Sequence, residues 1–119
     1  MNPERIVQKT ELTYTIRDGY PVSPGHMLII PISHVCSLFG ATPQEKDELL
    51  AALDAAKIDI DAELQPDGYN IGINDGSAAG QTVAHLHIHL IPRFTGDQQD
   101  PRGGVRWIFP EKANYWDKK

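Results

Sequence analysis

Residues 85–91, HLHIHLI, alternate polar and apolar side chains through their whole length. A period of two residues is typical of a β-strand with one buried face. Leu86, Ile88 and Leu90 are therefore expected to face a core, and the three imidazoles to share the opposite face. Residues on one face of a strand lie roughly 6.6 Å apart. The stretch thus predicts a strand that presents a row of histidines at one surface of a sheet.

A loop of small residues leads into this strand. Residues 74–82 have the sequence NDGSAAGQT, and Gly76 and Gly80 allow backbone N–H groups to converge on an oxyanion. Gln81 and Thr82 add side-chain hydrogen-bond donors. The loop alone is a weak indication, since glycine-rich loops mostly serve a turn. Its direct continuation into the histidines favours a phosphate-binding site.

The rest of the chain predicts further strands. Residues 12–16, 26–32 and 69–73 are apolar stretches of strand length, the first and last of which alternate with a period of two, and residues 105–109 (VRWIF) are a candidate short strand. The first two segments are expected to pair antiparallel across the turn and loop between them. Pro31 cannot donate to a ladder, which places it at the end of its strand or on a sheet edge.

One long helix is predicted between these strands. Thr42 can cap the helix, Pro43 suits its first turn, and Glu45 can complete a capping box. The helix should therefore begin near Pro43, end at residues 66–68 (PDG) and have about six turns. We expect an α+β fold, with an antiparallel sheet of about five strands and with one long helix and a short helix packed on it.

The composition restricts the classes of function. The chain has 119 residues with 11 Lys+Arg, 16 Asp+Glu and a formal net charge of −5, which predicts a single domain over residues 1–119. Residues 43–67 hold eight acids and two bases, so the acidity belongs mainly to the helix. Binding to long nucleic acid is disfavoured, because the phosphate backbone selects basic surfaces. A small anionic nucleotide at the loop is compatible with this charge.

The sequence also predicts a protein of a reducing compartment. Residues 1–14 lack the apolar region and the cleavage site of a signal peptide. The longest strongly apolar run, residues 27–32, is far shorter than the roughly 20 residues that span a bilayer. Cys36 is the single cysteine, and we expect it to be a small buried residue of a cytoplasmic protein with no membrane partner.

Three interpretations of the histidine row are open from the residues alone. Zinc binds imidazole nitrogen at about 2.1 Å, so His85 with His87, or His87 with His89, could share an ion, but no Cys-x-x-Cys pair completes such a site. The imidazoles could also decorate a polar face without chemistry. A neutral imidazole can attack phosphorus or a carbonyl carbon near neutral pH, while a protonated neighbouring imidazole stabilises or protonates the leaving group. The adjoining loop favours this catalytic interpretation.

These residues resemble the histidine triad (HIT) family, whose pattern is His-φ-His-φ-His-φ-φ with φ an apolar residue. Residues 85–91 match it completely. Residues 74–85 are similar to the family's loop before the triad, and residues 24–35 (PGHMLIIPISHV) to its early Gly-His strand and Pro-x-x-His turn. The resemblance runs from about Asp18 to Pro92, and residues 94–119 form a tail. Within the family, GQTV and a triad followed by Pro-Arg look closer to the fragile histidine triad and bacterial diadenosine polyphosphate hydrolase branches.

The resemblance implies a nucleotide hydrolase or nucleotidyl transferase that acts on dinucleoside polyphosphates or related nucleotidyl esters through a covalent nucleotidyl-histidine. By the family pattern His87 is the nucleophile, His85 helps to orient it, and His89 contacts phosphate or the leaving group. The pattern also implies contacts to substrate from Asn74, Gly80, Gln81, Thr82, His26 and Asp18. His34 is expected to be a structural turn residue.

The resemblance further implies a homodimer whose sheet continues across the interface, with a small nucleotide as substrate. It implies no required cofactor and no metal held by the protein, although a divalent metal ion could accompany the nucleotide. Two other activities are open, a purine nucleoside phosphoramidase and a nucleotide-binding or sensing module with little turnover. The tail aromatics Trp107, Tyr115 and Trp116 are expected to pack in the core or at an interface.

Overall fold

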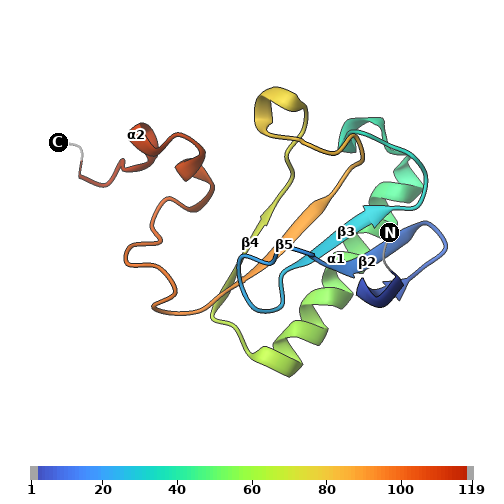
Figure 1. Cartoon of the computed structure of the whole chain (residues 1–119), viewed down its shortest axis with the longest axis horizontal. Helices are drawn as coiled ribbons and strands as arrows, with labels where there is room; N and C mark the ends of the chain where they lie inside the picture. Colours follow the sequence, from blue (N-terminus) through green and yellow to red (C-terminus); the bar gives the residue numbers. More distant parts are fainter. Residues whose placement is uncertain (1–2, 118–119) are drawn as a thin grey trace.

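A computed structural model describes residues 3–117 as an antiparallel five-stranded sheet with one long helix (Figure 1). The strands are β1 (Ile6–Lys9), β2 (Thr13–Arg17), β3 (Met27–Pro31), β4 (Gly68–Gly72) and β5 (Ile88–Arg93). The α-helices are α1 (Pro43–Leu64) and α2 (Pro110–Ala113), and the 3-10 helices are η1 (Pro3–Arg5), η2 (Leu38–Gly40), η3 (Ser77–Ala79) and η4 (Gly104–Ile108). The predicted α+β class is confirmed.

The strands follow the order β1-β2-β3-β5-β4, and each neighbouring pair is antiparallel. The predicted pairing of the two early strands is confirmed, with Thr13 opposite Pro31 and Arg17 opposite Met27. Pro31 is the last residue of β3, where its missing N–H leaves no gap in the ladder. β1 and β4 are the two edges of the sheet.

The predicted strand at residues 105–109 is wrong, and the fifth strand is β1. Residues 104–108 form η4 instead, because Gly103 and Gly104 have φ angles of 93° and 48° that turn the chain away from an extended path. β1 pairs with β2 through an irregular register between Ile6 and Gln8. β1 has four residues and none of them is buried, so its sequence carries no clear strand pattern.

The two faces of the sheet have different neighbours. α1 lies across one face (Figure 1), where buried side chains such as Leu49, Ile60 and Leu90 form the main core. The other face carries a smaller cluster of Ile16, Leu28 and Ile30. Leu28 pairs with His89 across neighbouring strands, and paired residues share a face. His89 therefore lies on the face that α1 leaves open.

α1 begins and ends as local chemistry predicts. The Thr42 side chain accepts a hydrogen bond from the Glu45 amide at 3.1 Å, and Glu45 accepts one from the Thr42 amide at 2.8 Å. This confirms the capping box. The helix has 22 residues and ends at Leu64, and the next residue, Gln65, has a left-handed backbone. Within residues 3–117, neither α1 nor any other helix has the length and apolarity needed to cross a membrane.

Residues 94–117 form an arm that extends away from the sheet (Figure 1). Its aromatic side chains pack within the arm and not in the main core. Trp107 donates a hydrogen bond to the Arg102 carbonyl at 2.7 Å, and the Arg102 guanidinium lies 4.5 Å from the centre of the Trp116 ring. Arg106 lies 4.9 Å from the centre of the Tyr115 ring. The short helix α2 packs against η4.

Candidate functional site

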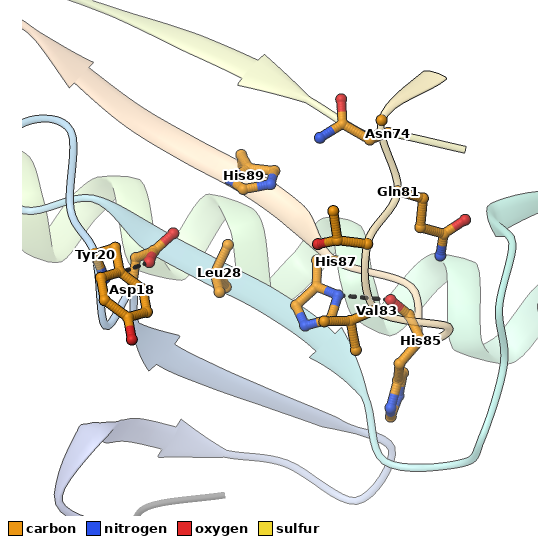
Figure 2. Close-up of a pocket in the computed structure, with 11 residues that line it drawn as sticks. Asp18, Tyr20, Leu28, Asn74, Gln81, Val83, His85, His87 and His89 are labelled. Atoms are coloured by element: carbon orange, nitrogen blue, oxygen red, sulfur yellow. Dashed lines mark hydrogen bonds between the residues drawn. The ribbon is translucent and has the colours of Figure 1, made fainter. Parts of the chain in front are cut away.

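A pocket of about 310 Å³ lies on the open face of the sheet. Its walls come from the loop after β2, from β3, from the segment between β4 and β5, and from β5 itself (Figure 2). The lining residues are Asp18, Tyr20, Leu28, Asn74, Gly80, Gln81, Thr82, Val83, His85, His87 and His89. Eight of the nine residues predicted from the sequence thus meet in one place, and only His26 does not line it.

The three histidines reach the pocket from two kinds of backbone. β5 begins at Ile88, so His89 lies in the sheet whereas His85 and His87 precede it. The predicted strand over 85–91 is therefore wrong in its start, because the Leu86 amide donates to the Val35 carbonyl at 2.7 Å, outside the ladder. The alternation itself is confirmed, since Leu86, Ile88 and Leu90 are buried while the histidines are only partly buried.

His87 has the protonation state that a nucleophile needs. Its Nδ1 lies 2.5 Å from the carbonyl oxygen of His85 (Figure 2). A carbonyl oxygen only accepts, so Nδ1 carries the hydrogen and Nε2 keeps its free electron pair. Burial lowers the pKa of His87 from its ordinary value of 6.5. The ring is therefore neutral at neutral pH and can attack an electrophile.

His85 orients His87 through its main chain. The carbonyl group of His85 fixes the His87 ring, whereas the His85 side chain points elsewhere, with Nε2 donating to the Pro31 carbonyl at 2.8 Å. The exposed ring of His34 packs edge-on against His85, with 5.5 Å between ring centres. The His85 ring therefore braces the segment before β5 against the end of β3.

The glycine loop is braced by a side chain from its own end. Gly76 and Gly80 both have φ of 92°, a conformation that favours glycine. The Gln81 side chain accepts a hydrogen bond from the Gly76 amide at 2.8 Å and donates one to the Cys36 carbonyl at 2.9 Å. Gln81 thus ties the loop together and to the segment after β3.

Cys36 is exposed, so its predicted burial is wrong. The segment that contains Cys36 lies over the glycine loop, outside the core.

His26 lies behind His89. It is 4% exposed, and its Nε2 lies 3.0 Å from Nδ1 of His89 and 3.3 Å from Oδ2 of Asp18. Its Nδ1 accepts a hydrogen bond from the Val22 amide at 3.2 Å. Burial lowers the pKa of His26, although the Asp18 carboxylate acts in the opposite direction. His26 therefore contacts the pocket through His89.

Asp18 takes part both in a turn and in the pocket wall. Its Oδ1 accepts a hydrogen bond from the Tyr20 amide at 2.8 Å, which is the Asp-Gly turn expected from the sequence. Its other oxygen faces His26. Asp18 and Tyr20 lie at one end of the pocket and Gln81 and His85 at the other (Figure 2).

The residues that come close enough together to hold a metal ion are not the pairs His85–His87 or His87–His89 considered from the sequence. Among residues 3–117, the ligand atoms that gather within 4.8 Å of one another belong to Asp18, His26 and His89. A metal on His26 Nε2 would require the ring hydrogen on Nδ1, yet Nδ1 faces the N–H group of Val22. The hydrogen on Nδ1 of His26 and the amide hydrogen of Val22 would then point at each other. The cluster as it stands does not suit a metal ion.

Three lining residues were not predicted from the sequence: Tyr20, Leu28 and Val83. Leu28 could have been found, because the paired strands place it opposite His89 on the open face. Tyr20 and Val83 have no such signal, since each lies in a loop whose path depends on contacts distant in sequence.

Comparison with known proteins agrees with this geometry. The model of the HIT domain family matches residues 1–96. The chain is 38% identical to AP-4-A phosphorylase from Mycobacterium tuberculosis over 93 residues, which cover 77% of this chain and 48% of the relative. It is 32% identical to bis(5'-adenosyl)-triphosphatase from Saccharomyces cerevisiae over 115 residues, which cover 96% of this chain and 53% of the relative. The chain thus spans about half the length of these curated relatives.

A solved structure has the same fold. A zinc-bound histidine triad family protein from Mycobacterium smegmatis superimposes with a TM-score of 0.72 at 35% identity. The match covers 80% of this chain and 69% of that protein.

Proposed function

This chain belongs to the HIT domain family, and on that basis we propose that it is a nucleotide hydrolase or nucleotidyl transferase acting on dinucleoside polyphosphates or related nucleotidyl esters. The observation that carries the proposal is the hydrogen bond from His87 Nδ1 to the His85 carbonyl. It leaves a neutral, partly buried imidazole with a free Nε2 electron pair in a pocket that also contains a glycine loop.

The proposed reaction has two steps. His87 Nε2 attacks the α-phosphorus, a P–N bond forms, and the P–O bond to the leaving phosphate breaks. The ring then carries positive charge, which its Nδ1–H bond to the His85 carbonyl stabilises. In the second step water attacks phosphorus, the P–N bond breaks, and the nucleoside monophosphate leaves while a water proton passes to solvent. Phosphate in place of water would give the transferase reaction.

The pocket offers a separate surface for each part of a nucleotide. Leu28 joins Ile16 and Ile30 in the apolar cluster on the open face, which suits a base. We assign Asp18, at the same end of the pocket, to the ribose. Gly80, Thr82 and Asn74 line the other end, where loop amides and side chains can hold phosphate oxygens. Both curated relatives described above carry names with adenosine phosphate compounds, which supports this substrate class.

A second candidate is a nucleotide-binding or sensing module with little turnover. The observation in its favour is Gln81, whose amide group is engaged at both ends by the backbone of the protein. One predicted phosphate contact is then absent unless the loop rearranges. Calorimetry separates the candidates, because tight nucleotide binding without product on any substrate would favour the module.

The test of the enzyme proposal is a His87→Ala protein assayed on diadenosine tetraphosphate and on an adenosine phosphoramidate. We expect turnover to fall at least about a thousandfold, as when a covalent nucleophile is removed. His34→Ala is the matched control, since His34 is an exposed histidine outside the pocket, and it should retain activity. Turnover that survives His87→Ala would reject His87 as the nucleophile. Product identification on both substrates separates a polyphosphate hydrolase from a phosphoramidase.

We further propose a homodimer whose sheet continues through the edge strand β4. β4 pairs only with β5 among the described strands, and its Ile71 is 49% exposed. Light scattering after gel filtration should give twice the mass of the chain, whereas a monomer at micromolar concentration would contradict the proposal.

We also propose a cytoplasmic location, because the lone exposed Cys36 suits a reducing compartment. Cell fractionation tests this location.

A further inference from the structure

His26 connects a backbone amide to the third histidine of the triad. The Val22 N–H group lies 3.2 Å from Nδ1 of His26, and Nε2 of His26 lies 3.0 Å from Nδ1 of His89. His26 is 4% exposed, so water does not compete for these bonds. Val22 is held in turn, since the next residue, Ser23, donates from its hydroxyl to the Pro92 carbonyl at 2.7 Å.

The direction of each hydrogen bond in this chain is determined. A backbone amide only donates, so Nδ1 of His26 must accept and carries no hydrogen. The hydrogen of neutral His26 is then on Nε2, which lies 3.0 Å from Nδ1 of His89 and 3.3 Å from Oδ2 of Asp18; it donates to the nearer acceptor, Nδ1 of His89. Because Nδ1 of His89 accepts, the hydrogen of His89 is on Nε2. The amide of Val22 thus sets the tautomer of a ring that lies two hydrogen bonds away.

The same arrangement keeps both rings neutral. A second proton on His89 would have to sit on Nδ1, where it would meet the N–H group of His26. A second proton on His26 would meet the N–H group of Val22. Burial lowers the pKa of both His26 and His89, and the proximity of His26 lowers that of His89 further. Asp18 favours the charged forms, but both pKa values remain below the ordinary value of 6.5.

We propose that His26 is a positioning residue that holds His89 as a neutral imidazole with its hydrogen on Nε2, so that His89 offers a hydrogen bond to the nucleotide and has no spare proton for a leaving group. This inference rests on the proposed function and narrows its substrate class. A neutral imidazole that donates without transferring its proton is an established means of electrostatic catalysis.

The consequence concerns the leaving group. When His87 attacks the α-phosphorus of a dinucleoside polyphosphate, the P–O bond breaks and the electron pair stays on a phosphate oxygen that is stable as an anion. No proton is needed, and the Nε2–H of His89 stabilises the developing charge. When the scissile bond is P–N, the electron pair goes to an amine nitrogen, which must gain a proton to leave. The site therefore favours polyphosphate over phosphoramidate substrates.

The tautomer can be measured without substrate. Two-bond ¹H–¹⁵N NMR spectra of uniformly ¹⁵N-labelled wild-type protein at neutral pH distinguish protonated from unprotonated ring nitrogens. We expect hydrogen on Nε2 and none on Nδ1 in both His26 and His89. A hydrogen on Nδ1 of either ring, alone or together with one on Nε2, would overturn the proposal. This measurement stands whether or not the protein is an enzyme.

The effect of the His89 tautomer on substrate preference is tested by comparing two substrates. The measured quantity is the ratio of kcat/KM for diadenosine tetraphosphate to kcat/KM for adenosine phosphoramidate. His26→Leu removes the donor and frees Nδ1 of His89, and Asp18, with a carboxylate oxygen within 4.8 Å of His89, then favours a second proton there. We expect the ratio to fall at least about tenfold, because a general acid becomes available for the amine. His26→Gln is the matched control, since its side-chain amide can place an N–H group toward His89, and it should leave the ratio within about threefold of wild type.

The possible outcomes are distinct. An unchanged ratio in a folded His26→Leu protein would overturn the role assigned to His26, since a merely structural role would lower both activities together. If His26→Leu does not fold, the wild-type NMR spectrum decides. No turnover of either substrate by the wild type would reject the proposed function while the spectrum still tests the tautomer.

Discussion

Gly25, in the loop before β3, lies against the last turn of α1, and its replacement by alanine should destabilise the fold. Its φ angle is 85°, and an added Cβ would lie 2.7 Å from Cδ1 of Leu64 and 3.3 Å from Cγ of Pro92. A left-handed backbone costs about 1–2 kcal/mol for a residue other than glycine. Overpacking adds about 1–3 kcal/mol, toward the lower end because Leu64 is 37% exposed and can move.

The expected loss in the free energy of unfolding is therefore about 2–4 kcal/mol. For a chain of 119 residues this corresponds to a fall in Tm of about 8–16 °C. Urea titration and thermal melting followed by circular dichroism measure both quantities. Gly68→Ala is the matched control, because nothing lies within 4 Å of its Cβ, and it should change stability by less than about 0.5 kcal/mol. Equal stability of Gly25→Ala and Gly68→Ala would show that neither the backbone angle nor the close contacts of Gly25 constrain this position.

Three further predictions concern the core, the helix cap and the nucleophile. Leu49 is 1% exposed, so Leu49→Ala should lower the free energy of unfolding by about 2–5 kcal/mol in urea titrations. Leu50 is 60% exposed, so Leu50→Ala should lower it by less than about 0.5 kcal/mol, and similar losses in the two variants would contradict the packing of α1. Thr42→Ala removes the acceptor for the Glu45 amide and should cost about 1 kcal/mol, and no change would mean that the cap does not stabilise α1. In the proposed mechanism the neutral form of His87 attacks phosphorus, and burial lowers its pKa below 6.5. We therefore expect kcat/KM to fall only as the pH drops below that value, and an acid limb above pH 6.5 would contradict the proposed role.

The sequence predicted those features that depend on neighbours along the chain. The start of α1 follows from Thr42 and Glu45, three residues apart, and it lies where predicted. The common face of the three histidines follows from alternation, and all three line the pocket. These features are local, because a capping box and a two-residue period are fixed by a few adjacent side chains.

Features that depend on distant segments could not be predicted in this way. β5 starts at Ile88 because Leu86 bonds to Val35, about 50 residues earlier. The contact between His26 and His89 joins residues 63 apart, and its direction depends on a backbone amide, which has no side chain to mark it. Residues 105–109 have the composition of a strand, yet the preceding glycines turn the chain and no partner strand is present within residues 3–117.

In the proposed reaction His87 Nε2 becomes covalently attached to the nucleotide. The most direct measurement is mass spectrometry of protein quenched in acid-free conditions during turnover of diadenosine tetraphosphate, with peptide mapping of the adduct. We expect one nucleoside monophosphate on His87, absent in His87→Ala and present in His34→Ala. An adduct on another residue, or steady turnover with no adduct at any quench time and no exchange of labelled leaving group into substrate, would contradict it.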